Sequence, residues 1–262
     1  MKKGTLVFIH GLWIHASSWQ SWMDYFEQAG YRTWNPPWPG DSGTVIECRK
    51  NPNAIANRGV TEIVNSYSQF ISTLPEVPVV IGHSFGGLIA QIILGRDLAK
   101  AAVAIDPAPI KGVWQLPITA LRASLPVLSN PLNLKKAVSL SFNQFRYGFA
   151  NAVPEDEARS LYDRWTIPAP ARPLFQAAVA SVAGSETKVN TSNHTRGPLL
   201  ITGGGKDHIA PPILGRASIQ KYNASVITDF KLFEDRGHSL IIDHGWDTIA
   251  KYSLDWLNQR GF

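Results

Sequence analysis

One five-residue segment, Gly-His-Ser-Phe-Gly at residues 82–86, constrains the possible folds of this chain more than any other feature. Before it, residues 77–81 are rich in valine and isoleucine, which predicts a fully buried strand. After it, residues 87–94 are apolar and predict a buried helix. A serine between such elements sits on a strained turn, and its flanking glycines let the two backbones approach without Cβ clashes. We therefore expect Ser84 at the carboxyl end of a strand, with helix amides directed toward it.

Length and composition limit the classes to which the chain can belong. Its 262 residues, 44% of them hydrophobic, suit a single α/β domain with room for an insertion. The net charge of +5 is spread along the sequence, so we expect no nucleic-acid partner. A single cysteine, Cys48, excludes an internal disulfide and any cysteine metal cluster.

The apolar runs are too short for a membrane span or a secretion signal. The first of them, residues 6–9, ends at His10-Gly11. The sequence therefore predicts a cytoplasmic protein without a membrane span, and it leaves the oligomeric state open.

Apolar β-rich runs alternate with helical patterns over most of the chain. Strands are predicted at residues 5–9, 31–35, 77–81, 101–105, 198–202 and 225–233, and helices at 17–29, 59–74, 87–94 and 249–259. This alternation predicts a mostly parallel, doubly wound sheet of about six strands, with its ligand site at the carboxyl ends of the strands. Since the first strand starts at Thr5, we expect the sheet to lack an N-terminal hairpin.

The alternation lapses between residues 108 and 196, which are punctuated by prolines and predicted to be mostly helical. We interpret this segment as a helical cap inserted into a core formed by residues 1–107 and 197–262. Helices are expected near residues 135–139, 155–165 and 173–183, and residues 42–58 are expected to be irregular. The aromatic residues of the cap either line a hydrophobic pocket or attach the cap to the core: Trp114, Phe142, Phe145, Tyr147, Phe149, Trp165 and Phe175.

Two residues suited to acid–base chemistry, Asp207 and His238, also follow predicted strands. A serine hydroxyl is a poor nucleophile until a base removes its proton, and an imidazole base needs a carboxylate to fix its tautomer. The pattern therefore predicts Ser84 as nucleophile, His238 as base and Asp207 as acid. Asp106, at the end of the strand after the serine helix, is a rival acid, and His244 is a substitute base.

These motifs resemble the α/β-hydrolase superfamily, and in particular its small capped serine-esterase-like branch. The resemblance covers the whole chain and rests on His10-Gly11, residues 82–86, residues 205–208 and Gly237-His238. It implies that Ser84, Asp207 and His238 form the catalytic triad in the order usual for this fold. It also implies an oxyanion hole made by the backbone N–H groups of Leu12 and Phe85, with Trp13 as the alternative to Leu12.

The resemblance further implies a carboxylesterase that acts on small to medium acyl groups through an acyl-enzyme, with a small-molecule ester as substrate and no cofactor or metal. The chain lacks a His-Gly-Gly-Gly motif, and it has serine where other branches use aspartate or cysteine. These departures disfavour the hormone-sensitive-lipase-like branch, haloalkane dehalogenases, epoxide hydrolases and dienelactone hydrolases. Alternatives are a lactonase, C–C hydrolase, perhydrolase or hydroxynitrile lyase with the same triad, or a ligand-binding protein with little turnover.

Overall fold

The computed structural model describes residues 3–180, 184 and 186–262. Six parallel strands form one sheet in the order β2-β1-β3-β4-β7-β8. The strands are β1 (Thr5–Ile9), β2 (Arg32–Trp34), β3 (Val79–His83), β4 (Ala101–Ile105), β7 (Leu199–Gly204) and β8 (Thr228–Phe233). From β1 the chain adds the edge strand β2 on one side and then β3, β4, β7 and β8 in turn on the other, which confirms the predicted doubly wound architecture.

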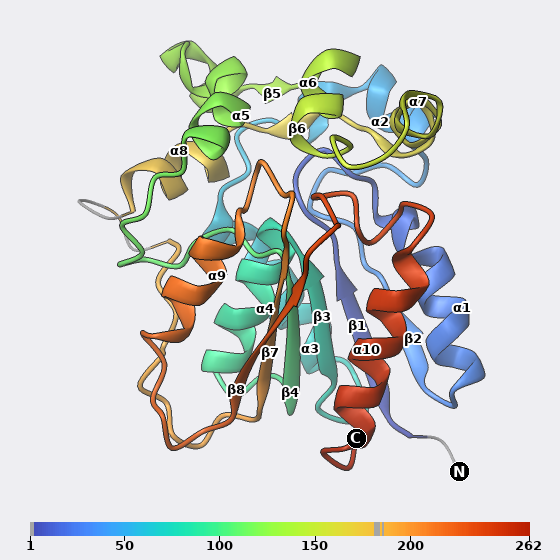
Figure 1. Ribbon diagram of the computed structural model, residues 1–262, viewed down its shortest axis with the longest axis vertical. Helices are drawn as coiled ribbons and strands as arrows, with labels where there is room; N and C mark the ends of the chain where they lie inside the picture. Colours follow the sequence, from blue (N-terminus) through green and yellow to red (C-terminus); the bar gives the residue numbers. More distant parts are fainter. Residues whose placement is uncertain (1–2, 181–183, 185) are drawn as a thin grey trace.

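Helices cover both faces of this sheet (Figure 1), which explains why its central strands are buried throughout and largely apolar. One face is covered by α1 (Gln20–Gln28) and α10 (Trp246–Asn258). The other face is covered by α3 (Val60–Ser72), α4 (Phe85–Gly95) and α9 (Pro212–Ile219). The alternating side chains of β1 divide the core accordingly: Leu6 and Phe8 pack toward α1, whereas Val7 and Ile9 pack toward α4.

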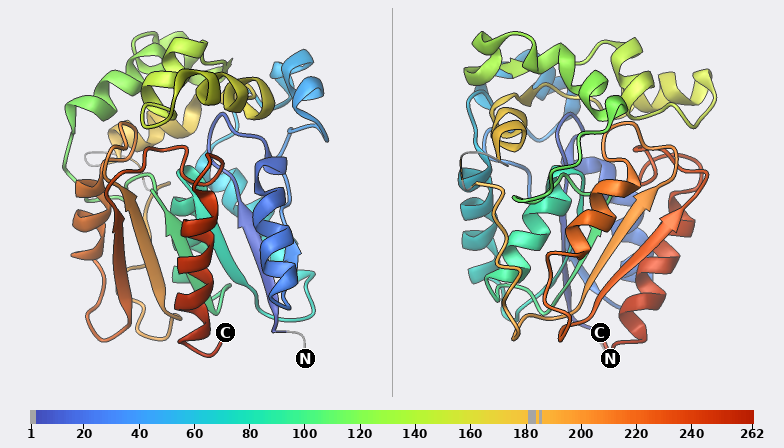
Figure 2. Two further views of the ribbon diagram at one scale, coloured as in Figure 1. Left: turned by 45° about the vertical axis from the view of Figure 1, so that its right-hand side comes forward. Right: turned by 60° about the vertical axis from the view of Figure 1, so that its left-hand side comes forward.

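A second layer of short elements lies across the carboxyl ends of the strands, at the opposite end from the two termini (Figure 1, Figure 2). It contains α5 (Ile118–Leu128), α6 (Phe142–Gly148), α7 (Glu155–Trp165), α8 (Arg172–Val179), the 3-10 helix η3 (Pro131–Lys135), and the paired strands β5 (Ala137–Val138) and β6 (Ala169–Pro170). We call these elements the cap layer. The division into a core of residues 1–107 and 197–262 and an inserted cap of residues 108–196 remains our proposal. No described helix is long and apolar enough to cross a membrane.

The cap layer departs from the sequence prediction in several places. The helix expected at residues 155–165 is α7, but the one expected near 135–139 is wrong, because the chain there extends into β5 and pairs with β6. Helix α5 was not predicted, since Pro126 lies inside it and interrupts the helical pattern. Helix α6 was not predicted either. The helix expected at 173–183 is represented by α8, and residues 181–183 lie outside the described residues.

Residues 42–58 are also more regular than expected. They contain α2 (Val45–Lys50) and the 3-10 helix η2 (Pro52–Ala54). The hydroxyl of Thr44 accepts a hydrogen bond from the Glu47 amide and caps α2, and a local cap of this kind can start a helix in a polar sequence. Near the N-terminus, the predicted helix at 17–29 is divided into a 3-10 turn, η1 (Ala16–Trp19), and α1.

Tryptophan substitutions test how the sheet is covered. Trp22 on α1 is fully buried against Phe8 and donates its indole N–H to the Ile241 carbonyl at 2.9 Å. Trp22→Ala should lower the free energy of unfolding by about 3–5 kcal/mol, because it leaves a cavity and an unpaired carbonyl. Trp34→Ala is the matched control, since Trp34 on β2 is 44% exposed. Denaturant unfolding of both variants measures the difference, and equal losses would contradict the described core.

Candidate active site

The backbone around Ser84 is strained and tightly packed. Ser84 follows β3 and precedes α4, with φ of 57° and ψ of −123°, a conformation that a residue with a side chain rarely adopts. A Cβ atom at position 82 would collide with the carbonyl of Gly86, and a Cβ at position 86 would collide with the carbonyl of Ile9. Only glycine fits at either position, so the turn needs both flanking glycines.

Hydrogen bonds hold Ser84 in this conformation. Its N–H donates to the Ile105 carbonyl at 2.9 Å, and its carbonyl accepts from the Ala108 amide at 3.0 Å and the Leu88 amide at 3.2 Å. Helix α4 begins at Phe85, whose N–H therefore has no partner within the helix and carries the positive end of the helix dipole. The site can thus offer a backbone donor next to the serine hydroxyl.

The loop after β1 lies directly against Ser84. A Cβ at Gly11 would be 2.7 Å from the Ser84 Cβ and 3.3 Å from its Oγ. The loop is held by His10, whose ring stacks on Trp38 and whose Nε2 accepts a hydrogen bond from the Trp38 amide at 3.2 Å. Trp13 has a positive φ of 65° and donates its indole N–H to the Val138 carbonyl at 2.9 Å. The loop that carries Leu12 is therefore fixed beside the serine.

Asp207 and His238 form a buried pair at the ends of β7 and β8. The Nδ1–H of His238 donates to Asp207 Oδ2 at 2.6 Å. The other carboxylate oxygen, Oδ1, accepts from the amides of Ile209 and Ala210 at 2.6 and 2.9 Å. With Nδ1 protonated, His238 Nε2 carries a lone pair. Among the described residues this buried atom has no hydrogen-bond partner, so it is available to accept a proton.

His83 fixes the position of the His238 ring. It precedes Ser84, and its ring centroid lies 4.5 Å from that of His238. Its Nε2–H donates to the His238 carbonyl at 2.9 Å. Burial, and secondarily the nearby His238, hold the pKa of His83 well below its usual value, so His83 is a neutral donor. The contact places the His238 ring beside the turn that carries Ser84. The serine and imidazole form no hydrogen bond in the described structure, and catalytic hydrogen bonds are often long without substrate.

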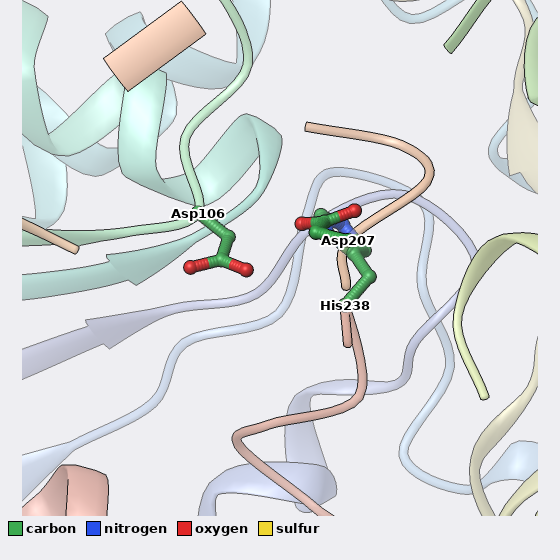
Figure 3. A group of neighbouring side chains, drawn as sticks. All are labelled: Asp106, Asp207 and His238. Carbon is green, nitrogen blue, oxygen red and sulfur yellow. The ribbon is translucent and has the colours of Figure 1, made fainter. Parts of the chain in front are cut away.

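A second carboxyl group adjoins the pair. Asp106 ends β4 and is buried, with Oδ2 accepting from the Gly204 amide at 3.1 Å. Figure 3 shows its side chain beside Asp207 and His238, and one ligand atom from each of the three lies within 4.8 Å of the others. These are residue types that bind cations, but His238 Nδ1 is occupied by its hydrogen bond to Asp207. We therefore interpret the group as a hydrogen-bond network.

The two carboxyl groups differ in charge. Burial, followed by the charge of Asp207 and a hydrogen bond to it, raises the pKa of Asp106 well above its usual value. Burial acts to raise the pKa of Asp207 too, but the electrostatic interaction with the His238 ring and hydrogen bonds from His238, Asp106 and Ala210 outweigh it and lower that pKa. These opposite shifts favour the arrangement in which Asp106 holds the proton and Asp207 is the ionised partner of His238.

A segment of the cap layer, residues 147–151, braces the loops that carry the acid and the base. The Tyr147 carbonyl accepts from His208 Nδ1 at 2.8 Å, next to Asp207, and the side-chain Nδ2 of Asn151 donates to the Lys206 carbonyl at 2.8 Å. The Phe149 carbonyl accepts from the Ser239 amide at 2.9 Å, next to His238. No cap residue was predicted as a site residue. Tyr147 and Phe149 act here through backbone carbonyls, which leave no sequence signal, and Asn151 acts through a side-chain amide outside any motif.

An apolar cavity of about 280 Å³ opens above Ser84 and Phe85. Its larger aliphatic lining residues are Leu116, Leu121, Leu128, Leu174, Ile209 and Leu214, and no charged side chain of the described chain lines it. None of the seven cap aromatics does so either. Phe145 and Phe149 are buried in the core, which favours the attachment role over the pocket role for these two residues. Trp114 is largely exposed.

The other residues considered from the sequence lie at different places. His244 is exposed, and its Nδ1 lies 2.9 Å from Glu157 on α7. His208 supports the Asp207 loop, and His10 supports the loop beside Ser84. The structure therefore gathers Ser84, Asp207 and His238 at one edge of the sheet, adds Asp106, and leaves His244 outside.

Comparison with family profiles identifies one family. The sequence profile of the alpha/beta hydrolase family matches residues 6–252. A search of curated protein sequences finds no match.

Solved structures match over nearly the whole chain. One is an extracellular alpha/beta-hydrolase from a Paenibacillus species, described as sharing homology with tobacco salicylic acid binding protein 2. It is 19% identical with a TM-score of 0.70, and the match covers 96% of this chain and 98% of that one. A monoacylglycerol lipase from Paleococcus ferrophilus is 20% identical with a TM-score of 0.69, covering 98% and 94%. A methylesterase from Arabidopsis is 16% identical with a TM-score of 0.67, covering 97% and 98%. At these identities the likeness establishes the fold alone.

The neutral state of Asp106 has a consequence for stability. A buried carboxyl with a raised pKa costs stability as the pH rises above the unfolded value near 4, because the unfolded chain releases its proton first. In Asp106→Asn the amide keeps both hydrogen bonds and does not titrate. The unfolding free energy of this variant, relative to wild type, should therefore increase with pH. The increase should be about 1.4 kcal/mol per pH unit between the unfolded and the folded pKa of Asp106.

Denaturant unfolding across the acid to neutral range measures this difference. The infrared C=O band of a protonated carboxyl should be present in the wild type at neutral pH and absent from Asp106→Asn. A relative stability that falls with rising pH would contradict a neutral Asp106.

Proposed function

The chain belongs to the alpha/beta hydrolase family and has its fold, and on that premise we propose that it hydrolyses carboxylic esters with Ser84 as nucleophile. The geometry of His238 carries this proposal. Its Nδ1–H is fixed by Asp207 at 2.6 Å, and its Nε2 lone pair is buried, unpartnered and beside the turn that bears the serine. An imidazole so arranged suits a general base better than a structural role.

The proposed reaction has two stages. His238 Nε2 takes the hydroxyl proton while Ser84 Oγ bonds to the ester carbonyl carbon, and the imidazolium then protonates the departing alcohol. A water molecule next gives a proton to His238 Nε2 while its oxygen bonds to the acyl carbon. The acyl–Oγ bond then breaks, the imidazolium returns the proton to Ser84 Oγ, and the carboxylic acid is released. Asp207 keeps its charge throughout and stabilises the imidazolium.

The oxyanion of each tetrahedral intermediate needs two donors. We assign these to the backbone N–H groups of Phe85 and Leu12. Phe85 begins α4, and Gly11 packs on Ser84, which brings the neighbouring Leu12 amide close to the reacting carbon. Each donor of this kind lowers the barrier by about 2.7–4 kcal/mol.

The cavity supports an uncharged acyl group of small to medium size. Its volume of about 280 Å³ is near the lower end for ligand pockets, which begin at about 300 Å³. Its lining is largely aliphatic, and no lining residue from the described chain could pair with a charged acyl chain. A charged group there would lose its hydration without compensation.

Asp207, not Asp106, is assigned as the triad acid. Asp207 bonds directly to His238, whereas Asp106 bonds to the Gly204 amide and to Asp207. A neutral carboxyl stabilises an imidazolium less than a carboxylate does, so Asp106 is less suited to this role.

Loss of the nucleophile should abolish turnover. In Ser84→Ala we expect ester hydrolysis to fall by at least about 10⁴-fold with the fold retained, because no other group can form the acyl-enzyme. Intact mass after incubation with a fluorophosphonate should show one adduct on the wild type and none on this variant. Ser124→Ala, which alters another cavity serine, is the control and should keep the adduct.

The result separates the alternatives. No adduct on folded wild type would contradict an activated Ser84 and favour a ligand-binding protein. Rapid quenching with a p-nitrophenyl ester should trap an added acyl mass. An adduct with fluorophosphonate but no trapped acyl group would favour a hydroxynitrile lyase, which forms no acyl-enzyme.

The loop after β1 offers a second test. In Gly11→Ala the new Cβ would lie 2.7 Å from the Ser84 Cβ and 2.9 Å from the His83 carbonyl, so the loop must shift. A shift near 1 Å should reduce kcat about a hundredfold. Gly43→Ala is the control, because its Cβ would meet only Glu47 Oε2 at 3.8 Å. Unchanged kcat in Gly11→Ala would contradict an oxyanion donor in this loop.

A further inference from the structure

One region of the cap layer exposes an unusual amount of apolar surface. Of the thirteen large hydrophobic side chains exposed in the described chain, seven lie between residues 114 and 134. We call the exposed side of residues 114–134, which contain α5 and most of η3, the α5 surface. Folded chains rarely leave large contiguous apolar patches in water, and such patches commonly mark sites of interaction.

The helix itself is turned outward. Ile118, Leu121 and Leu125 recur at helical spacing and are 83%, 47% and 57% exposed. Within α5 only Val127 is buried. Figure 1 and Figure 2 show α5 at one end of the cap layer, away from the sheet. No described element of the chain covers this apolar face.

The α5 surface is continuous with the cavity above Ser84. Leu116, 73% exposed, and Leu121 belong to the surface and also line the cavity. An apolar molecule leaving an external apolar phase could therefore pass along α5 into the cavity without crossing polar surface.

Within residues 107–154, which contain the α5 surface, every charged side chain is basic, although Lys111 donates to the Gly184 carbonyl, beside which the Glu186 carboxylate also lies. Residues 107–154 contain no aspartate or glutamate. Their five cations are all exposed: Lys111, Arg122, Lys135, Lys136 and Arg146. Arg146 pairs with Glu155 at 3.3 Å, on α7 at the other end of the cap layer. Apolar side chains with a basic surround are the pattern of segments that lie in the surface of an anionic bilayer.

We propose that the α5 surface binds an anionic lipid–water interface, with Ile118 and Leu125 entering the lipid and the surrounding lysines and arginines contacting the headgroups. A second copy of the chain is the competing occupant. A two-fold contact would place the same basic residues opposite one another, so like charges would meet without acidic partners from residues 107–154. An anionic lipid surface complements both the apolar and the charged parts.

Vesicle co-sedimentation tests this directly, and it is independent of the proposed ester hydrolysis because it can be run with Ser84→Ala. Vesicles of phosphatidylglycerol with phosphatidylcholine should bind the protein, and pure phosphatidylcholine vesicles should bind it less. Added salt should weaken the binding. Ile118→Ser/Leu125→Ser should lower the partition coefficient at least about tenfold, since two large side chains no longer enter the lipid.

Matched variants distinguish specific from general effects. Ile227→Ser removes an exposed side chain of similar type beside β8 and should leave binding unchanged. Lys135→Gln/Lys136→Gln should lower binding only to the anionic vesicles, whereas Arg32→Gln, an exposed change on β2, should not. Ile118 and Leu125 do not line the cavity, so hydrolysis of a water-soluble ester should persist in their double variant.

Three outcomes would overturn the proposal: no binding to anionic vesicles, equal binding by Ile118→Ser/Leu125→Ser, or equal binding to neutral and anionic lipid. Sedimentation velocity without lipid tests whether a second copy of the chain binds the α5 surface instead. A dimer that Ile118→Ser/Leu125→Ser dissociates would show that the α5 surface is an interface between copies.

Discussion

Three backbones approach one another at Ser84, and the rest of the site depends on this close contact. Gly82 faces the start of α4, Gly86 faces the end of β1, and Gly11 packs on the serine itself. Because a Cβ fits at none of these points, two strands and a helix are locked together around a residue held at positive φ. Such strain costs on the order of 1–3 kcal/mol, and burial of the sheet on both faces offsets it.

Below the cavity, three buried titratable side chains lie close together. Asp106, Asp207 and His238 come from the ends of three neighbouring strands and are almost fully buried. Two ionised carboxylates in one buried cluster are energetically unfavourable, and the raised pKa of Asp106 and lowered pKa of Asp207 favour a proton on Asp106. The neutral acid then acts as a donor that helps keep Asp207 ionised beside the imidazole.

The cap layer has more than one role in this arrangement. Residues 147–151 bind the loops that carry Asp207 and His238, so the cap helps to position the candidate site as well as covering it. Helix α5 contributes one wall of the cavity and leaves its outer face in solvent. The same short helix therefore lines the cavity above Ser84 and carries the surface for which we propose lipid contact.

By itself the sequence determined the parallel sheet and the turn at residues 82–86, because strand periodicity and glycine spacing act locally. It also predicted Asp207 and His238 as the partners of Ser84, since parallel strand ends converge, and that assignment remains our proposal. It named Asp106 only as a rival acid. Tertiary structure alone decided that Asp106 adjoins Asp207 as a neutral partner, that residues 147–151 brace both loops, and that α5 faces outward. These features depend on contacts between distant segments and on backbone carbonyls, which carry no residue signature.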